Sequence, residues 1–279
     1  MNLSPTTQHQ PPPATGKHLA TIARECRSSV IDMLTQAKSS HIGCSFSVID
    51  ILVVLYHYIL DVEKIKQQSP DRDYFILSKG HAASGLYAVL ASVGLIEHTM
   101  LKDFHRGFLA GHPTRNCAHG IEASTGSLGH GLSMGVGLAL AAKHDNRPSR
   151  VYVIVGDGEC QEGSIWEALT MAARFGLNNL VVIVDNNNLQ GFGRTDTIAT
   201  GSLHEKFTAF GCTTTTVDGH DYAKLIATIS GCTSTKPHVI IAKTIKGKGL
   251  SFIEDKLEWH YKSLTPEQSA QAHQEVSAS

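Results

Sequence analysis

The residues best suited to chemistry lie in two short polar turns, each directly after an apolar run. The turn Gly156-Asp157-Gly158 follows residues 151–155, and the turn Asp185–Asn188 follows residues 180–184. Runs of this length, rich in β-branched side chains, predict strands that are buried on both faces of a parallel sheet. We therefore expect both polar turns to begin where a buried strand ends.

The residues between the two turns complete a strand–helix–strand unit. Ser164 is the expected N-cap of a helix that ends at Gly176 and carries an apolar stripe at Ile165, Ala168, Leu169, Ala172 and Ala173. In a right-handed unit of this kind both turns lie at one edge of the sheet, so Asp157 is expected to meet the asparagines 186–188. A carboxylate with amide oxygens suits Mg²⁺ shared with a diphosphate better than zinc or a redox metal.

Gly-Asp-Gly alone is more often an ordinary turn, but its combination with the helix and the asparagines is much rarer. The stretch resembles the diphosphate-binding motif of thiamine diphosphate enzymes, and residues 156–168, GDGECQEGSIWEA, resemble the transketolase branch. The resemblance implies that Mg²⁺, or Ca²⁺ or Mn²⁺ in its place, is held by Asp157, Asn187 and the main-chain carbonyl of Leu189. It also implies cofactor contacts from Gly156, Asp157, Gly158, Glu159 and Asn187.

Four histidines lie where a helix or strand gives way to a glycine-bearing loop, at His41, His81, His112 and His260. Singly, each is more often a surface or satisfied histidine, but all four loops can converge on the ligand-binding edge of a parallel sheet. Their motifs resemble four histidine motifs of transketolases in the same order. The resemblance implies that they line the site and help proton transfer, with His81 and His260 also contacting the cofactor; neutral imidazole can both donate and accept.

Two further segments have both an ordinary and a functional interpretation. Gly126-Ser127-Leu128-Gly129 opens a small-residue helix, which suits close packing or an anion equally, and by resemblance Gly126, Ser127 and Leu128 run under the cofactor rings. Glu162 and Glu167 are helix-N-terminal carboxylates favoured by the macrodipole, or by resemblance a catalytic relay between paired active sites. The sequence departs from the family pattern at His130, where Gln is usual, and at Ile42, which bears on donor specificity.

Composition and pattern indicate one large α/β domain, a doubly wound parallel sheet with helices on both faces, which the resemblance makes the diphosphate-type thiamine diphosphate-binding domain. The chain has 279 residues, 42% of them hydrophobic, and a net charge of −1, so nothing points to nucleic acid or an anionic membrane. No apolar run is expected to reach a spanning length. Six cysteines without metal or disulfide spacing favour reduced thiols in a cytoplasmic enzyme. Residues 1–16 are expected to be a disordered tail and 17–279 the domain.

Spacing and turn residues predict the remaining elements. Expected strands are 72–77, 213–217 and 238–244, and long loops are expected at 106–126 and 191–201. Ser47 is the expected cap of a helix over 48–60. The other expected helices are 18–38, the segment from 82 to Gly94, 97–104, the segment from 126 to 143, 202–210 and 221–230.

The resemblance covers residues 18–262, whereas whole transketolases are more than twice as long and use a second domain to bind the aminopyrimidine. It therefore implies the N-terminal subunit of a split transketolase, acting on sugars as an α₂β₂ assembly with a separate C-terminal subunit. Alternatives are the alpha subunit of a 2-oxo-acid dehydrogenase, a specialised transketolase-like enzyme of secondary metabolism, or a non-catalytic regulatory paralogue. The ordered histidine motifs favour transketolase over the dehydrogenase, and intact Asp157 and Asn187 oppose the paralogue.

Overall fold

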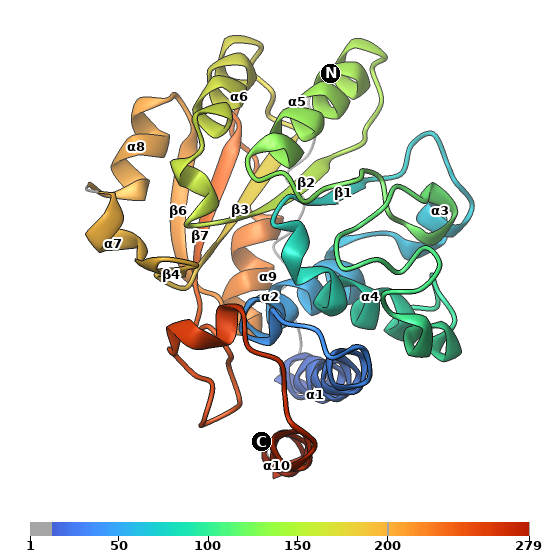
Figure 1. Cartoon of the computed structure of the whole chain (residues 1–279). Helices are drawn as coiled ribbons and strands as arrows, with labels where there is room; N and C mark the ends of the chain where they lie inside the picture. Colours follow the sequence, from blue (N-terminus) through green and yellow to red (C-terminus); the bar gives the residue numbers. More distant parts are fainter. Residues whose placement is uncertain (1–12, 200, 279) are drawn as a thin grey trace.

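The computed structural model describes residues 13–199 and 201–278, and a five-stranded parallel sheet crosses its middle (Figure 1). The strand order is β1-β2-β3-β7-β6. The central strands are buried along almost their whole length, as their continuous apolar runs predict. The strands are β1 (Tyr74–Leu77), β2 (Val151–Gly156), β3 (Leu180–Asn186), β6 (Thr213–Asp218) and β7 (His238–Lys243).

Helices cover both faces of the sheet, so the doubly wound α/β architecture is confirmed (Figure 1). Because successive strand residues point to opposite faces, Ile154 and Ile183 pack in one core while Val153 and Val182 pack in the other. The first core includes α1 (Pro13–Ala37), α2 (Ile42–Val54), α4 (Ala83–Ser92) and α9 (Tyr222–Ser230). The second includes α5 (His130–His144), α6 (Gly163–Arg174) and α8 (Leu203–Ala209).

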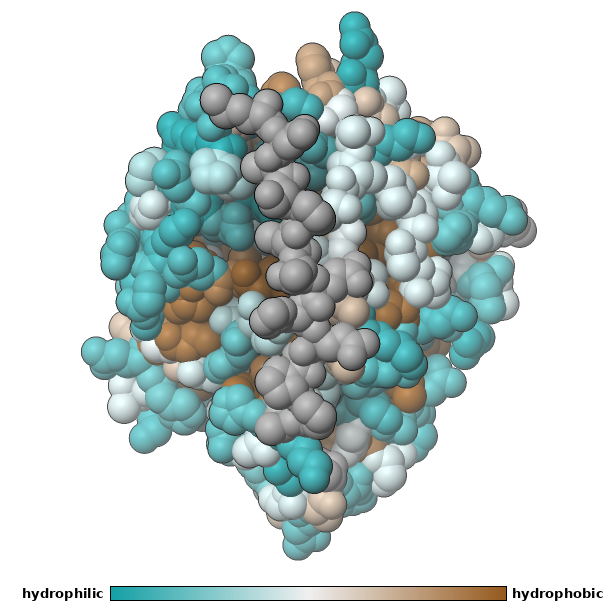
Figure 2. Space-filling view, turned by 180° about the vertical axis from the view of Figure 1, so that it is seen from behind, coloured by the Kyte–Doolittle hydropathy of each residue, from teal (hydrophilic) through white to brown (hydrophobic). Residues whose placement is uncertain are grey.

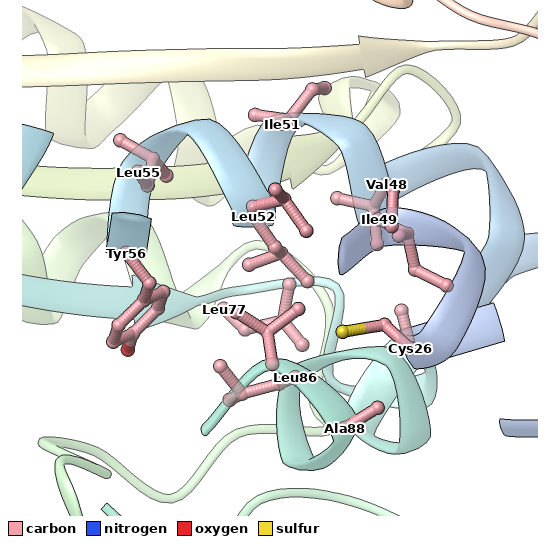
Figure 3. Close-up of a cluster of buried hydrophobic side chains, with 14 of the residues drawn as sticks. Cys26, Val48, Ile49, Ile51, Leu52, Leu55, Tyr56, Leu77, Leu86 and Ala88 are labelled. Carbon is pink, nitrogen blue, oxygen red and sulfur yellow. The ribbon is translucent and has the colours of Figure 1, made fainter. Parts of the chain in front are cut away.

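Helix α2 lies at the centre of the first core, and Figure 3 shows Leu52 of this helix facing Leu77 of β1 and Leu86 of α4. All 13 residues of α2 are buried. With the π-helical turn Leu55–Ile59 it forms an 18-residue apolar helix, Ile42–Ile59, so the expectation that no run reaches a spanning length was wrong. Since 83% of this segment is buried inside the domain, core packing accounts for its apolar composition.

Several expected boundaries were wrong. Helix α2 begins at Ile42, so Ser47 lies inside it rather than at its N-cap. The Ser47 hydroxyl donates to the buried Asp185 carboxylate instead. Helix α6 begins after Glu162 rather than at Ser164, and no side chain caps it. Helix α1 begins at Pro13 within the expected tail, whose residues 1–12 lie outside the described part. The segment 97–104 is 3₁₀-helical, over His98–Asp103.

The structure adds elements to those expected from the sequence. In the expected loop after Gln190, the hairpin β4 (Leu189–Gln190) and β5 (Gly193–Arg194) is followed by α7 (Thr195–Ile198). The C-terminal helix α10 (Pro266–Ala278) packs on α1. The short helices are α3 (Val62–Lys66), η2 (Gly80–Ala82), η4 (Cys117–His119), η5 (Glu159–Gln161) and η6 (Leu257–His260). From behind, hydrophobic residues show in patches between hydrophilic ones (Figure 2).

The sheet brings the ends of its central strands to one edge. Register pairs Gly156 with Asp185, and Asn186 with Lys243. The polar turns after β2 and β3 therefore start side by side, as predicted from the right-handed connection. All six cysteines are free, so no disulfide contributes to this arrangement.

Candidate functional site

A pocket of about 650 Å³ opens at this edge of the sheet and collects most of the residues singled out in the sequence. Seven stretches of the chain line it. Among the lining residues are His41, His81, His112, Gly126, Leu128, Gly156, Asp157, Gly158, Glu159, Glu162, Asn187, Leu189 and His260. A larger hollow of about 810 Å³ lies on the other side of Asp157. It contains none of the four histidines, so we place the candidate site in the smaller pocket.

The four histidine rings lie together, although they come from loops up to about 200 residues apart in the chain. The centroid of the His41 ring is 5.4 Å from that of His81, 5.3 Å from His260 and 6.5 Å from His112. His41 itself has a left-handed backbone, with φ of 74°, which is uncommon outside glycine. Strain of this kind is typical of residues that the surrounding structure holds for a function.

The histidines of the pocket are neutral at pH 7. Burial, with the repulsion that two protonated rings at His41 and His260 would feel, lowers the pKa of His41 to about 4. Burial, with the Lys246 ammonium, lowers the pKa of His260 to about 4. The pKa values of His81 and His112 are lowered as well, chiefly by burial. Each ring therefore offers the pocket one N–H donor and one acceptor nitrogen.

Asp157 is a buried carboxylate with no cationic partner in direct contact among the described residues. Its Oδ1 accepts from the Gly158 N–H at 2.9 Å, and its Oδ2 accepts from the Asn188 N–H at 2.6 Å and from the Thr195 hydroxyl at 3.3 Å. Burial, with the nearby Asp185 carboxylate, raises the pKa of Asp157 to about 6. A cation beside Asp157 would remove this cost of burying its charge.

The donor set around Asp157 fits a hard divalent ion. Asn187 and Leu189 line the same pocket, and the Asn187 Oδ1 atom accepts from the Leu189 N–H at 3.1 Å. The described residues contain no cluster of three His, Cys, Asp or Glu side chains that could hold a metal. An ion here would therefore rely on amide and main-chain oxygens beside one carboxylate, which suits Mg²⁺ or Ca²⁺ and not zinc.

Glu159 lies in the wall of the pocket with both carboxylate oxygens used by the protein. Oε1 accepts from the Ser78 hydroxyl at 2.5 Å and from the Gly129 N–H at 2.8 Å, and Oε2 accepts from the Gly156 N–H at 2.9 Å. Burial raises its pKa, and these hydrogen bonds oppose that shift. Glu159 thus joins the ends of β1 and β2 to the start of α5.

Only some of the other predicted site residues line the pocket. Gly126 and Leu128 line the pocket, whereas Ser127 between them is exposed and is not part of its lining. The left-handed backbone of Gly126, with φ of 144°, lets the chain pass the His112 ring, which an added Cβ would approach to 3.1 Å. Glu162 lines the pocket, while Glu167 is exposed on α6 and lies outside it. The structure therefore separates the two glutamates.

Sequence reasoning missed a buried ion pair beneath the pocket, between Lys79 and Asp185. Burial alone would lower the pKa of Lys79, but the Asp185 carboxylate raises it; Lys79 in turn holds the pKa of Asp185 below its usual range. Asp185 also accepts from the hydroxyls of Ser47, at 2.6 Å, and Thr244. Asp185 stood in a polar turn already singled out and Lys79 lies two residues before His81, but nothing local marked them as partners.

Sequence reasoning also missed two groups beside His260. Lys246 is 1% exposed and its Nζ lies 2.9 Å from the His260 Nδ1 atom. The Cys44 Sγ atom lies 3.8 Å from the same nitrogen. Burial would raise the pKa of Cys44, but its interaction with His81, together with the Lys246 ammonium, lowers it to about 6. The available signal was the position of Lys246, directly before Gly247 and shortly after an expected strand.

Comparison with known proteins identifies the family. Residues 19–278 match the family model described as transketolase, thiamine diphosphate binding domain. The chain belongs to the transketolase family. It is 40% identical over 257 residues to one subunit of the apulose-4-phosphate transketolase of Phocaeicola vulgatus, covering 90% of this chain and 91% of that one. It is 36% identical over 256 residues to a 6-deoxy-6-sulfo-D-fructose transketolase subunit of a Clostridium species, covering 90% and 92%.

The fold is also that of transketolases. The crystal structure of Campylobacter jejuni transketolase superposes with a TM-score of 0.86 at 30% identity, over 94% of this chain. This chain spans 43% of the Campylobacter transketolase chain. Membership of the transketolase family decides against the 2-oxo-acid dehydrogenase alternative.

Proposed function

We propose that this chain is the diphosphate-binding subunit of a two-component transketolase. With Mg²⁺ and thiamine diphosphate, the assembled enzyme would transfer a two-carbon ketol unit from a ketose donor to an aldose acceptor. The observation that carries the proposal is the pocket itself, where four neutral histidine rings face the same space as Asp157 and Asn187. Such a site combines a place for a hard cation with several groups able to move protons near neutral pH.

In this proposal different residues of the pocket bind the metal, the diphosphate and the sugar. Asp157, Asn187 and the Leu189 carbonyl would hold the metal, and the Gly158 N–H and His81 would contact the diphosphate. The cofactor, when bound, supplies the carbanion chemistry, and the protein supplies orientation and electrostatics. His41, His112 and His260 would donate to and accept from the hydroxyl and carbonyl oxygens of the sugar.

A partner subunit is supported by the surface around the pocket mouth. Phe192 is 89% exposed and Tyr261 is 62% exposed, and both line the pocket. Leu128 and Ile198, also in its lining, are exposed as well. Large apolar side chains gathered around a mouth are typical of an interaction surface. We propose that a separate C-terminal subunit, with the pyrimidine-binding domain, covers this mouth in a cytoplasmic α₂β₂ assembly.

The names of the relatives guide the choice of substrate. One relative is named for a ketose phosphate and another for a sulfonated ketose. We propose a ketose with an anionic group at its far end as the donor, and such sugars are the first to screen.

Calorimetry with thiamine diphosphate and Mg²⁺ tests this function on three samples: this chain, a co-expressed C-terminal transketolase subunit, and the pair. We expect tight binding by the pair alone. Tight binding by this chain alone would show that it forms a complete site without a partner. A pair that binds no cofactor would overturn the proposed function.

A non-catalytic paralogue would give a different result in the same pair. It would bind the partner, yet the pair would release no aldose from any ketose in the donor screen. The retained Asp157 and Asn187 oppose this alternative, since both line the pocket. Turnover by the pair, measured as aldose release, decides between the two.

A further inference from the structure

Lys246 is a buried lysine whose side chain ends against a histidine of the pocket. It is 1% exposed, and its Nζ atom lies 2.9 Å from the Nδ1 atom of His260. Gly43 leaves room for its stem, since an added Cβ there would lie 3.0 Å from the Lys246 Cγ atom. Among the described residues, Lys246 forms no ion pair with a carboxylate. Its ammonium is therefore directed at His260.

The backbone beside Lys246 is held by the segment that follows β6, the strand next to β7. The Ile245 N–H donates to the His220 Nε2 atom at 2.9 Å. The neutral His220 ring must then carry its proton on Nδ1, which lies 2.6 Å from Asp50 and donates to it. The Lys246 carbonyl accepts from the Asp255 N–H at 3.0 Å. Lys246 is thus fixed on both sides of its Cα atom.

The contact between Lys246 and His260 dictates where the ring carries its proton. An ammonium has three donors and no acceptor, so the His260 Nδ1 atom must accept. A neutral imidazole has a single N–H, which is then on Nε2. Hydrogen bonds from charged donors are about twice as strong as neutral ones, so this tautomer should be favoured by roughly tenfold or more.

Cys44 is the one competing group near the same nitrogen among the described residues. As a thiolate it would favour a proton on the His260 Nδ1 atom, whereas as a thiol it would donate to this atom. Its sulfur is 3.8 Å away, against 2.9 Å for Lys246. Above about pH 6 both contacts involve a charged group, and the Lys246 contact is the shorter, so it should determine the tautomer.

We propose that Lys246 is a positioning residue that holds His260 as the neutral Nε2–H tautomer. The free N–H makes His260 a hydrogen-bond donor toward the pocket, ready to donate to an oxygen of a bound sugar. Lys246 acts here through His260 rather than on the reacting atoms. The role in catalysis rests on the proposed function, but the tautomer is a property of this chain alone.

The test is a long-range ¹H–¹⁵N spectrum of the full chain labelled with ¹⁵N-histidine, recorded near pH 7.5 without cofactor. His260→Gln identifies the His260 signals by their loss. We expect the wild-type ring to show a protonated Nε2 and a bare Nδ1. In Lys246→Met this preference should fall at least several-fold toward a mixture of tautomers, while Lys246→Arg, which keeps a charged donor, should retain it.

Two controls separate this effect from unfolding and from Cys44. His273 on α10, which contacts Asp32 and Ser28, should give unchanged signals in every variant. Cys44→Ala should leave the His260 tautomer unchanged. A protonated Nδ1 in the wild type, or an unchanged tautomer in folded Lys246→Met, would overturn the proposal. Cofactor binding by the subunit pair is a separate measurement, so failure there would overturn only the proposed function.

Discussion

Two buried carboxylates of this domain, Asp50 and Asp185, have nearly the same surroundings but opposite relations to the pocket. Asp50 pairs with Arg27 and also accepts from His220 and Tyr222, each at 2.6 Å. We call these four residues the distal network. Both oxygens of Asp50 have two donors, and its pKa is far below the usual range, since Arg27 outweighs the effect of burial.

Asp185 pairs with Lys79 and accepts from Ser47 and Thr244, and we call these four residues the pocket network. Around it, charges are left without direct compensation. The pKa of Asp157 is raised by burial, and that of Cys44 is lowered by neighbouring cations despite burial. The distal network uses both oxygens of Asp50, although the buried Nε atom of Arg27 has no hydrogen-bond partner among the described residues. Its role is to stabilise the fold, whereas the groups beside the pocket network are able to receive a ligand.

The sharpest contrast between the two regions is in their cysteines. Burial raises the pKa of Cys26, beside Arg27, to about 12, while that of Cys44 is lowered to about 6. The reactive thiolate of Cys44 therefore forms as the pH rises through about 6. We expect iodoacetamide to label Cys44 at neutral pH several orders of magnitude faster than Cys26, measured by peptide mass spectrometry.

The unfolded chain, in which all six cysteines should react, is the reference for that labelling. Cys44→Ser should remove the early product. A Cys44 reaction that begins only near the ordinary thiol pKa would contradict the contrast between the two regions.

Removing the carboxylate of the distal network should cost the most stability. Asp50→Ala leaves the buried Arg27 guanidinium without its partner, so the free energy of unfolding should fall by about 3–5 kcal/mol. Urea unfolding measures this change. Asp221→Ala, which removes the half-buried N-cap of α9, is the matched control and should cost about 1 kcal/mol. Equal costs for the two variants would show that the distal network is not a stabilising one.

Removing Asp157 should affect binding rather than folding. Loss of groups around metal ligands usually weakens affinity about 10–100-fold, so loss of a ligand itself should reach at least about 100-fold. In the subunit pair, Asp157→Ala should therefore abolish tight Mg²⁺-dependent binding of thiamine diphosphate in calorimetry. Its free energy of unfolding should change far less than that of Asp50→Ala. Unchanged cofactor affinity in Asp157→Ala would refute the metal site. The control is Asp145→Ala, at an exposed aspartate, which should leave cofactor affinity unchanged.

A pair of hydroxyl deletions compares the two networks on equal terms. Tyr222→Phe and Thr244→Val each remove one donor to a buried carboxylate, so each should lower the free energy of unfolding by about 1.5–3 kcal/mol. Only Thr244→Val should also weaken cofactor binding by the subunit pair, by about tenfold. If Tyr222→Phe weakened it equally, the distal network would belong to the site.

Much of the fold was predictable because a buried parallel strand can be recognised from a few neighbouring residues. The runs 151–155 and 180–184 are continuous and apolar, and a right-handed connection then places their polar turns together. The contact between the Asn188 N–H and Asp157 confirms that placement. The convergence of the four histidines followed the same reasoning, since all four loops belong to one edge of the sheet.

The errors came where a tertiary contact outweighed a local preference. Serine is a common N-cap residue, yet Ser47 lies inside α2. Its hydroxyl donates a hydrogen bond to Asp185, which is 138 positions away in the sequence. Ser164 is near the start of α6 without capping it. A sequence pattern shows what a residue is able to do and not which distant group it meets.

The sequence by itself determined the sheet, its polar edge and the residue types gathered there, because strand burial and turn chemistry act over a few neighbouring residues. Only the tertiary structure decided the partners: Lys79 with Asp185, Thr244 with the same carboxylate, and Lys246 with His260. Buried charges need partners, and packing brings together side chains from distant segments without any period in the sequence.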